Sequence, residues 1–298
     1  MSRAPGGPAL EVLASGPLAT VQDLGRPGHA DWGVGTSGAA DRASLRLANR
    51  LVGNPEGAAG VEVTLGGLSV RVLGDVVAAL TGAPCPAQIE GERGPRAVAN
   101  NAVLTLGDGD VLTLGQPEAG LRTYLAVRGG VDVAPVLGSR ATDVLAGLGP
   151  DVLTARMRLP IGAAPPNFPC VDVAPVADLP NTDVTLRVMV GPRQDWFTPA
   201  ALDALLSRDW TVTPDSNRVG MRLSGPELMR SVHGELPSEG VVRGALQVPP
   251  SGLPTLFLAD HPLTGGYPVI AVVRSADVDR AAQARPGQKL RFRQRSGE

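Results

Sequence analysis

The chain has 298 residues with 27 basic and 29 acidic side chains, and its net charge of −2 argues against nucleic-acid binding, which needs a basic face. Its 38 glycines and 28 prolines favour many short elements joined by turns, while a hydrophobic content of 43% excludes a disordered chain. No apolar run approaches the ~18 residues of a membrane span, and the first residues lack the apolar core of a signal peptide. We therefore expect a soluble, cytoplasmic protein.

Alternation of apolar and polar residues predicts strands in both halves of the chain. The expected strands are 10–14, 61–65, 68–72, 76–80, 103–106, 111–114 and 121–127, then 185–190, 241–248, 255–258, 269–273 and 289–292. The segment 108–110 (Asp-Gly-Asp) is typical of a tight hairpin between its two flanking strands.

One short helix is expected in each half. In the first, Ser37 can cap the helix, Asp41 suits its first turn, and the Gly-Asn-Pro segment 53–55 ends it. In the second, Thr198 can cap the helix and Pro199 occupies the first helical position.

Three short segments recur at nearly one offset, which indicates an internal repeat. Residues 10–14 resemble 186–190, residues 41–47 resemble 217–223, and residues 109–112 resemble 287–290. We predict two copies of one fold, at 8–162 and 183–296, joined by a proline-rich connector at 163–182. Many strands with one helix per copy predict a mainly β protein made of two small barrels, each with a short helix.

Several kinds of chemistry are poorly represented in the sequence. Lys289 is the only lysine, so a phosphate-binding P-loop is excluded, and it lacks the flanking methionines of a biotin-attachment site. Cys85 and Cys170 form no C-x-x-C pair, which predicts two buried thiols. The three histidines are scattered, so no metal site is expected.

Three polar, glycine-rich clusters are candidate binding regions. Residues 20–28 with 33–42 interleave charges and glycines, which suits ligand contact or an internal salt-bridge network over a helix N-terminus. Residues 238–240, 247–249, 260 and 264–268 can bind an amide edge through Gln247, Asp260 and Tyr267, or form a tight turn on the barrel rim. Residues 128–130 with 138–140 can hold an anion, or form a surface turn with a solvated arginine.

The same clusters resemble a known family. The motifs, in chain order, are Thr-Val-Gln-Asp-Leu-Gly-Arg at 20–26, Ser-Gly-Ala-Ala-Asp at 37–41, Leu-Val-Gly-Asn at 51–54, Arg-Gly-Gly at 128–130, Leu-Gly-Ser-Arg at 137–140, Gly-Pro-Arg at 191–193, Gln-Val-Pro at 247–249 and Gly-Gly-Tyr-Pro at 265–268. Together they look like the biotin-dependent carboxyltransferase family, also called allophanate hydrolase subunit 2 or Kip-antagonist-like. The resemblance covers nearly the whole chain.

The resemblance implies two cyclophilin-like β-barrels and a role in a hetero-oligomer. Stand-alone bacterial members are typically the C subunit of an ATP-dependent 5-oxoprolinase, a hydrolase that opens the lactam of 5-oxo-L-proline to L-glutamate. The implied partners are the Kip-inhibitor-like B subunit of that enzyme and its A subunit, of the lactam-utilisation type, with ATP used by the complex. One alternative is a carboxyltransferase subunit that moves a carboxyl group from carboxybiotin to urea or a similar amide. Another is a non-enzymatic regulatory protein of the Kip-antagonist type.

The resemblance also implies roles for the polar clusters, because an activated amide needs groups that orient it and stabilise negative charge. The residues expected to be catalytic are Asp23, Arg26, Asp41 and Arg218. Those expected to bind substrate are Gln22, Ser37, Arg128, Gln247, Asp260, Gly265, Gly266 and Tyr267.

Overall fold

The computed structural model describes residues 7–92, 94–169 and 171–294. Within them the chain forms two compact units. The first unit takes the described residues of 7–26, Asp41–Asp143 and Gly147–Leu179, and the second takes Pro27–Ala40, Val144–Ala146 and 180–294. Two segments from the first half of the sequence thus belong to the second unit, while the domain limits expected from the sequence stay a prediction.

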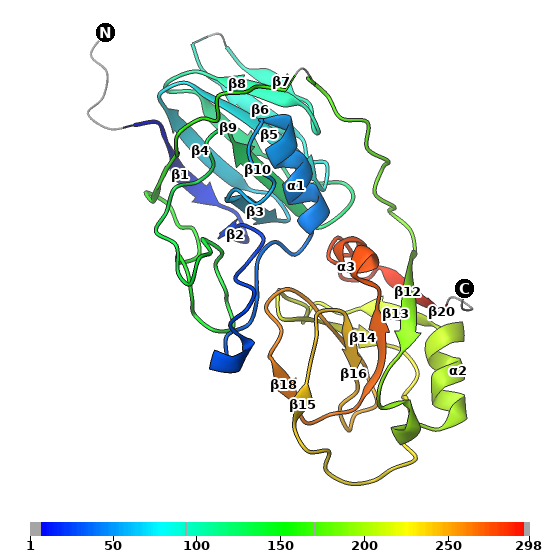
Figure 1. Cartoon of the computed structure of the whole chain (residues 1–298). Coiled ribbons are helices and arrows are strands. Elements are labelled where there is room, and N and C mark those ends of the chain that lie inside the picture. The colour runs from blue at the N-terminus through cyan, green and yellow to red at the C-terminus, as the bar shows by residue number, and fades with distance from the viewer. Residues whose placement is uncertain (1–6, 93, 170, 295–298) are drawn as a thin grey trace. The chain divides into compact units, whose positions relative to one another are not determined.

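The first unit is built from two antiparallel sheets (Figure 1). One sheet has the order β11 (Arg158–Pro160), β1 (Ala9–Ser15), β4 (Leu68–Leu73), β9 (Val111–Leu114), β6 (Ala87–Glu90) and β7 (Arg96–Val98). The other has the order β2 (Leu18–Gln22), β3 (Gly60–Thr64), β10 (Arg122–Val127), β5 (Val76–Gly82) and β8 (Val103–Leu106). Apolar residues from both sheets, such as Val70 and Leu125, share one core, as alternating strands with one buried face require.

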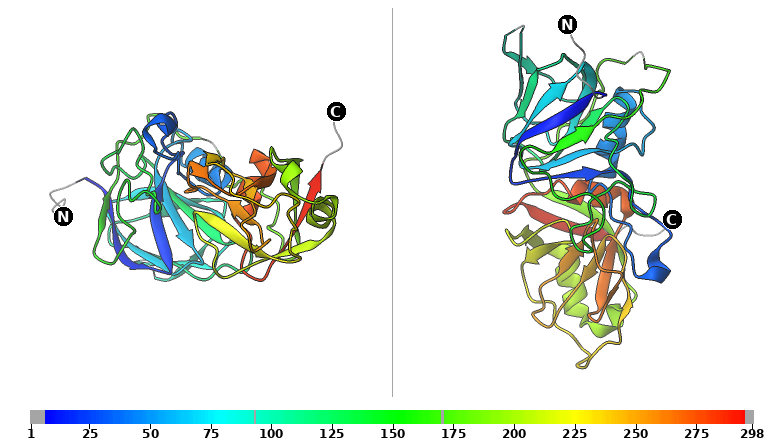
Figure 2. Two further views of the ribbon diagram at one scale, coloured as in Figure 1. Left: turned by 90° about the horizontal axis from the view of Figure 1, so that it is seen from below. Right: turned by 90° about the vertical axis from the view of Figure 1, so that its left-hand side faces the viewer.

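Helix α1 (Arg42–Leu51) packs on β5 and β10 of the first unit (Figure 2). Its N-cap is Asp41, whose Oδ1 accepts a hydrogen bond from the Ser44 amide at 3.0 Å. The prediction that Ser37 caps this helix is wrong, because a capping side chain must directly precede the first turn to reach its free N–H groups. Ser37 lies four residues earlier and in the second unit.

The second unit is a closed seven-stranded barrel. Its strands follow the order β12 (Val184–Val190), β19 (Val269–Val273), β16 (Ala245–Gln247), β17 (Thr255–Phe257), β14 (Gly220–Ser224), β13 (Asp209–Val212) and β20 (Lys289–Gln294), and β20 returns to β12 in parallel. Trp210 and Phe292 fill its core and are fully buried. Outside this barrel, β15 (Glu239–Gly240) and β18 (Thr264–Gly265) form a small two-stranded sheet.

The second unit contains two α-helices where the sequence predicted one. Helix α2 (Pro199–Ser207) begins as expected, since the Thr198 side chain accepts from the Ala201 amide and Pro199 is the first helical residue. Helix α3 (Ser275–Ala281) was not predicted, and no side chain caps its N-terminus. Among the described residues, no helix is long and apolar enough to cross a bilayer.

The structure confirms a mainly β fold but corrects two details. Strands β8 and β9 belong to different sheets, so the Asp-Gly-Asp turn between them does not close a hairpin. Residues 41–47 begin a helix whereas 217–223 enter strand β14, so this match is not a structural equivalence. The described strands of the first unit are joined as two sheets, and the tandem pair of cyclophilin-like barrels stays a prediction.

Candidate functional site

Arg218 and Asp260 form a buried ion pair in the second unit. Arg218 donates from Nε to Asp260 Oδ2 at 2.9 Å and from Nη2 to Oδ1 at 3.0 Å. The two side chains are 1% and 0% exposed. Arg218 lies two residues before β14 and Asp260 three residues after β17, and these two strands are paired. Such a two-bond arrangement is the strongest geometry available to an arginine and a carboxylate.

This ion pair also fixes the two segments that join the second unit from the first half of the chain. Asp260 accepts from Ser37 Oγ at 2.6 Å and from the Val144 amide at 3.2 Å. Arg218 Nη2 donates to the Gly38 carbonyl at 2.7 Å. The structure thus brings together three predicted site residues: Ser37, Arg218 and Asp260. All of their hydrogen bonds described here are made to other groups of the protein.

Asp23 lies just after β2 in the first unit, and its carboxylate accepts three hydrogen bonds. Its carboxylate accepts from the Gly25 amide at 2.7 Å, from Ser139 Oγ at 2.6 Å and from the Arg140 amide at 2.7 Å. The residue is 8% exposed. These three donors show that Asp23 holds the 138–140 loop against the end of β2.

Gln22 and Arg26 fix the continuation of the same loop. Gln22 Nε2 donates to the Thr142 carbonyl at 2.9 Å, and its buried Oε1 has no hydrogen-bond partner in the described part of the chain. Arg26 is 1% exposed, donates to the Ala141 carbonyl, and has Nη1 3.8 Å from Asp143 Oδ2. Gln22, Asp23 and Arg26 are therefore a cluster that positions residues 138–143.

Asp41 belongs to a separate buried network beneath α1. Its backbone amide donates to Tyr124 Oη at 2.8 Å, and this hydroxyl donates to Glu62 Oε2 at 2.7 Å. Burial, followed by the negative charges of Glu62 and Asp41, raises the pKa of the Tyr124 phenol well above its usual value. The phenol therefore remains a neutral hydrogen-bond donor at ordinary pH.

Arg128 follows β10 and bonds to three backbone carbonyls. It donates to the Val52 carbonyl at the end of α1 at 2.8 Å, to the Asn167 carbonyl at 3.0 Å, and to the Pro165 carbonyl. Its guanidinium lies 4.7 Å from the centre of the Phe168 ring. In this structure Arg128 joins the connector to the first unit.

A cavity of about 300 Å³ lies on the outer face of the barrel in the second unit. Strands β14, β17 and β16 form its floor, because their intervening residues, such as Met221 and Leu256, point into the barrel core. The lining residues used below are Asp215, Arg222, Gln247, Pro249, Phe257 and Tyr267. Two predicted site residues, Gln247 and Tyr267, thus line one cavity.

Gln247 and Tyr267 are held together by a hydrogen bond from Gln247 Nε2 to the Tyr267 carbonyl at 3.1 Å. Gly265 lies against the same amide, since a Cβ there would be 2.4 Å from Gln247 Nε2. Behind the Tyr267 ring lies Arg230, whose guanidinium is 6.0 Å from the ring centre and whose pKa is lowered by burial. Gly266 follows in the same turn, where a Cβ would be 3.4 Å from the Leu236 carbonyl.

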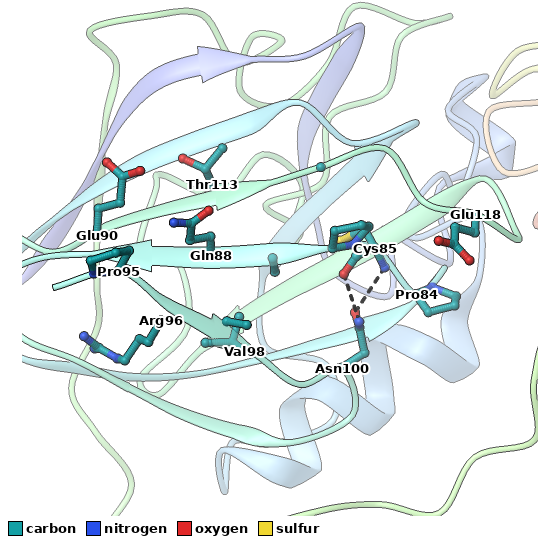
Figure 3. A pocket seen from close by; sticks show the side chains of 14 residues that line it. Pro84, Cys85, Gln88, Glu90, Pro95, Arg96, Val98, Asn100, Thr113 and Glu118 are labelled. Carbon is teal, nitrogen blue, oxygen red and sulfur yellow. Dashed lines mark hydrogen bonds between the residues drawn. The ribbon is translucent and has the colours of Figure 1, made fainter.

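A larger cavity of about 920 Å³ lies in the first unit over β6, β7 and β9 (Figure 3). Figure 3 shows Gln88, Glu90 and Thr113 on one side of it and Asn100 bonded to the backbone of Cys85. None of the predicted site residues lines this cavity.

Cys85 is buried, as predicted, and burial raises the pKa of its thiol, whereas Cys170 lies outside the described residues. In the part that the structure describes, no group of three or more His, Cys, Asp or Glu side chains could hold a metal ion.

The barrel, its buried ion pair and its outer cavity belong to a chain whose residues 32–294 match the carboxyltransferase domain, subdomain A and B, family. The chain is a member of this family, which confirms the resemblance stated from its motifs. It is 40% identical to the C subunit of 5-oxoprolinase from Escherichia coli (strain K12), over 97% of this chain and 92% of that protein.

Two solved structures are similar over nearly the whole chain. TTHA0988 superimposes with a TM-score of 0.87 at 37% identity, covering 98% of this chain and 56% of that one. The K. lactis urea amidolyase superimposes with a TM-score of 0.88 at 29% identity, covering 95% of this chain and 18% of that one. The chain therefore spans little more than half of the first solved chain and a small part of the second.

Proposed function

We propose that this chain is one component of an ATP-dependent 5-oxoprolinase that opens a cyclic amide and is catalytic only with its partner subunits. The observation that carries the proposal is the mutual coverage with the C subunit of the Escherichia coli 5-oxoprolinase, which is 97% of this chain and 92% of that protein. The urea amidolyase, in contrast, is matched over 18% of its length, so most of that protein has no counterpart in this chain.

The partners proposed are the Kip-inhibitor-like B subunit of the enzyme and its lactam-utilisation A subunit. The outer cavity of the barrel has a volume of about 300 Å³ and is lined by Gln247 and Tyr267, whose polar groups suit an amide. We place the nucleotide on one of the partners and assign this chain the binding of the amide. Biotin belongs only to the carboxyltransferase alternative.

The predicted site residues divide into two kinds in this proposal. Residues whose polar groups bond to other parts of the protein position the loops, and those at the outer cavity contact the substrate. The positioning residues are Gln22, Asp23, Arg26, Ser37, Asp41, Arg128, Arg218 and Asp260. The contact residues are Gln247 and Tyr267, with Gly265 and Gly266 shaping the adjacent turn.

We also interpret the two sheets of the first unit as a more open form of the cyclophilin-like barrel expected from the sequence.

A reconstitution assay tests the proposed function. The chain is mixed with its two partner subunits, 5-oxo-L-proline and ATP, and glutamate and phosphate are followed together while each of the three proteins is omitted in turn. Glutamate formation that stops when this chain is left out supports the proposal. A stable complex that forms no glutamate overturns it, and carboxybiotin with urea is then the substrate pair for the alternative.

A further inference from the structure

We propose that the outer cavity of the barrel binds the substrate and selects amides that carry a carboxylate, with Arg222 as the partner of that carboxylate. The inference rests on the proposed function and identifies the substrate class of its site. Arg222 was not among the residues expected from the sequence.

Strand register places the polar groups of this cavity in one row. Arg222 on β14 and Gln247 on β16 both lie opposite Thr255 on β17, which runs between them. Because neighbouring strands are about 4.8 Å apart, the Cα atoms of Arg222 and Gln247 are about 10 Å apart. Two side chains that project from the same face over this distance leave room for a small molecule between them.

The Arg222 guanidinium is available to a ligand. Arg222 is exposed, and the described residues offer it neither a side-chain hydrogen bond nor an ion pair. Asp215 also lines the cavity, but no ion pair joins it to Arg222. In contrast, Arg218 and Arg193 of the same unit are paired with carboxylates. An unpaired arginine fork at the edge of a cavity is suited to bind a ligand carboxylate through two parallel hydrogen bonds.

Gln247 and Tyr267 offer the complement of an amide edge. The Tyr267 carbonyl accepts only, so the Gln247 group bonded to it must be the NH₂, which leaves Oε1 as an acceptor. The Tyr267 hydroxyl has no partner among the residues described, and its side chain is 46% exposed. A ligand N–H can therefore donate to Oε1 while the ligand C=O accepts from the phenol.

Apolar residues complete the cavity between these polar groups. Phe257, which is 7% exposed, and Pro249 line it beside the row. A ligand that matches all three parts of the cavity has a carboxylate, an amide and a few methylenes, as a small carboxylated lactam does. Urea has only the amide, so it can bind neither to the arginine as an anion nor to the apolar wall.

The test compares three probes that differ in these features: 5-oxo-L-proline, 2-pyrrolidinone (the same ring without the carboxylate) and urea. In the reconstituted complex, Arg222→Gln is expected to raise the KM for 5-oxo-L-proline at least tenfold with little change in kcat. Arg208→Gln is the matched control, because Arg208 is an exposed arginine outside the cavity. An Arg222→Gln complex with the wild-type KM overturns the inference and leaves the proposed function intact.

Titration of the full chain alone separates failure of the site from failure of the function. The wild-type chain is expected to bind 5-oxo-L-proline at least tenfold more tightly than 2-pyrrolidinone, with urea weakest, and Arg222→Gln is expected to remove the preference for the carboxylate. This arm decides the inference even if the complex forms no glutamate. Equal binding of the two rings, or no binding of either, overturns it.

Discussion

Replacing Arg218 by methionine is expected to destabilise the second unit by about 3–5 kcal/mol, because it leaves a buried carboxylate without its ion-pair partner. The substitution keeps most of the side-chain volume but removes two of the four hydrogen bonds described at Asp260, those of 2.9 and 3.0 Å. At roughly 1.5–3 kcal/mol for each hydrogen bond to a charged group, their loss gives a similar figure. Only the bonds from Ser37 and Val144 then remain.

Tryptophan fluorescence during urea unfolding measures this loss in the relevant unit, since Trp32, Trp196 and Trp210 all belong to the second unit. The control is Arg291→Met, which removes a half-exposed arginine of the same barrel and is expected to change the midpoint little, since exposed pairs contribute weakly.

Asp260→Asn and the double variant with Arg218→Met complete a thermodynamic cycle. The double variant is expected to lose about 2 kcal/mol less than the two single losses combined, because each single change already breaks the same pair. A loss below about 1 kcal/mol for Arg218→Met, or strictly additive losses, contradicts the view that this pair fixes the two added segments to the barrel.

Two further predictions concern the same unit. Gly265→Ala is expected to raise the KM of the reconstituted complex for 5-oxo-L-proline, because the new Cβ would lie 2.4 Å from Gln247 Nε2. The control is Gly240→Ala, where a new Cβ would have no atom within 4 Å. Equal KM values for the two variants refute the role of this contact. At Asp277, burial alone would raise the pKa, but hydrogen bonds and charge from Arg187 outweigh it and hold the pKa of the carboxyl below its usual value. Its stabilising effect is therefore complete above pH ~4 and lost as the pH falls through the lowered pKa, so Asp277→Asn should have a lower Tm at pH 7 and a shallower loss of Tm below pH 4. Parallel Tm profiles for the two proteins contradict this assignment.

The elements that the sequence predicted well are those whose own residues determine them. Strand β4 alternates strictly, and α2 has a threonine cap followed by proline, so local physics is sufficient for both. Strands β6 (Ala-Gln-Ile-Glu) and β13 (Asp-Trp-Thr-Val) were missed because their few apolar residues give a weak pattern, whereas the equally short β8 and β9 both read Val-Leu-Thr-Leu. Helix α3 was missed because no capping side chain marks its start.

The candidate site was predictable in residue type but not in arrangement. For the first cluster, the sequence left ligand contact and an internal network both open, and the observed bonds of Asp23 form an internal network. Asp23 meets Ser139 across 116 positions and Ser37 meets Asp260 across 223, so no local pattern could identify these pairs. For Arg222 a local signal existed, since buried Met221 and Leu223 flank it, but its register with Gln247 is a property of the folded barrel.

The difference between loop-positioning residues and cavity residues decides how activity data on them must be interpreted. The buried carboxylate of Asp23 accepts three hydrogen bonds from its own loops, so its loss should displace those loops and lower the thermal stability together with the activity. The Tyr267 hydroxyl bonds to none of the described residues and its ring is exposed, so Tyr267→Phe should weaken substrate binding with the Tm unchanged. Activity loss alone therefore assigns neither residue to substrate contact. Only the combination of a raised KM with an unchanged Tm separates a group that touches the amide from one that supports the loop.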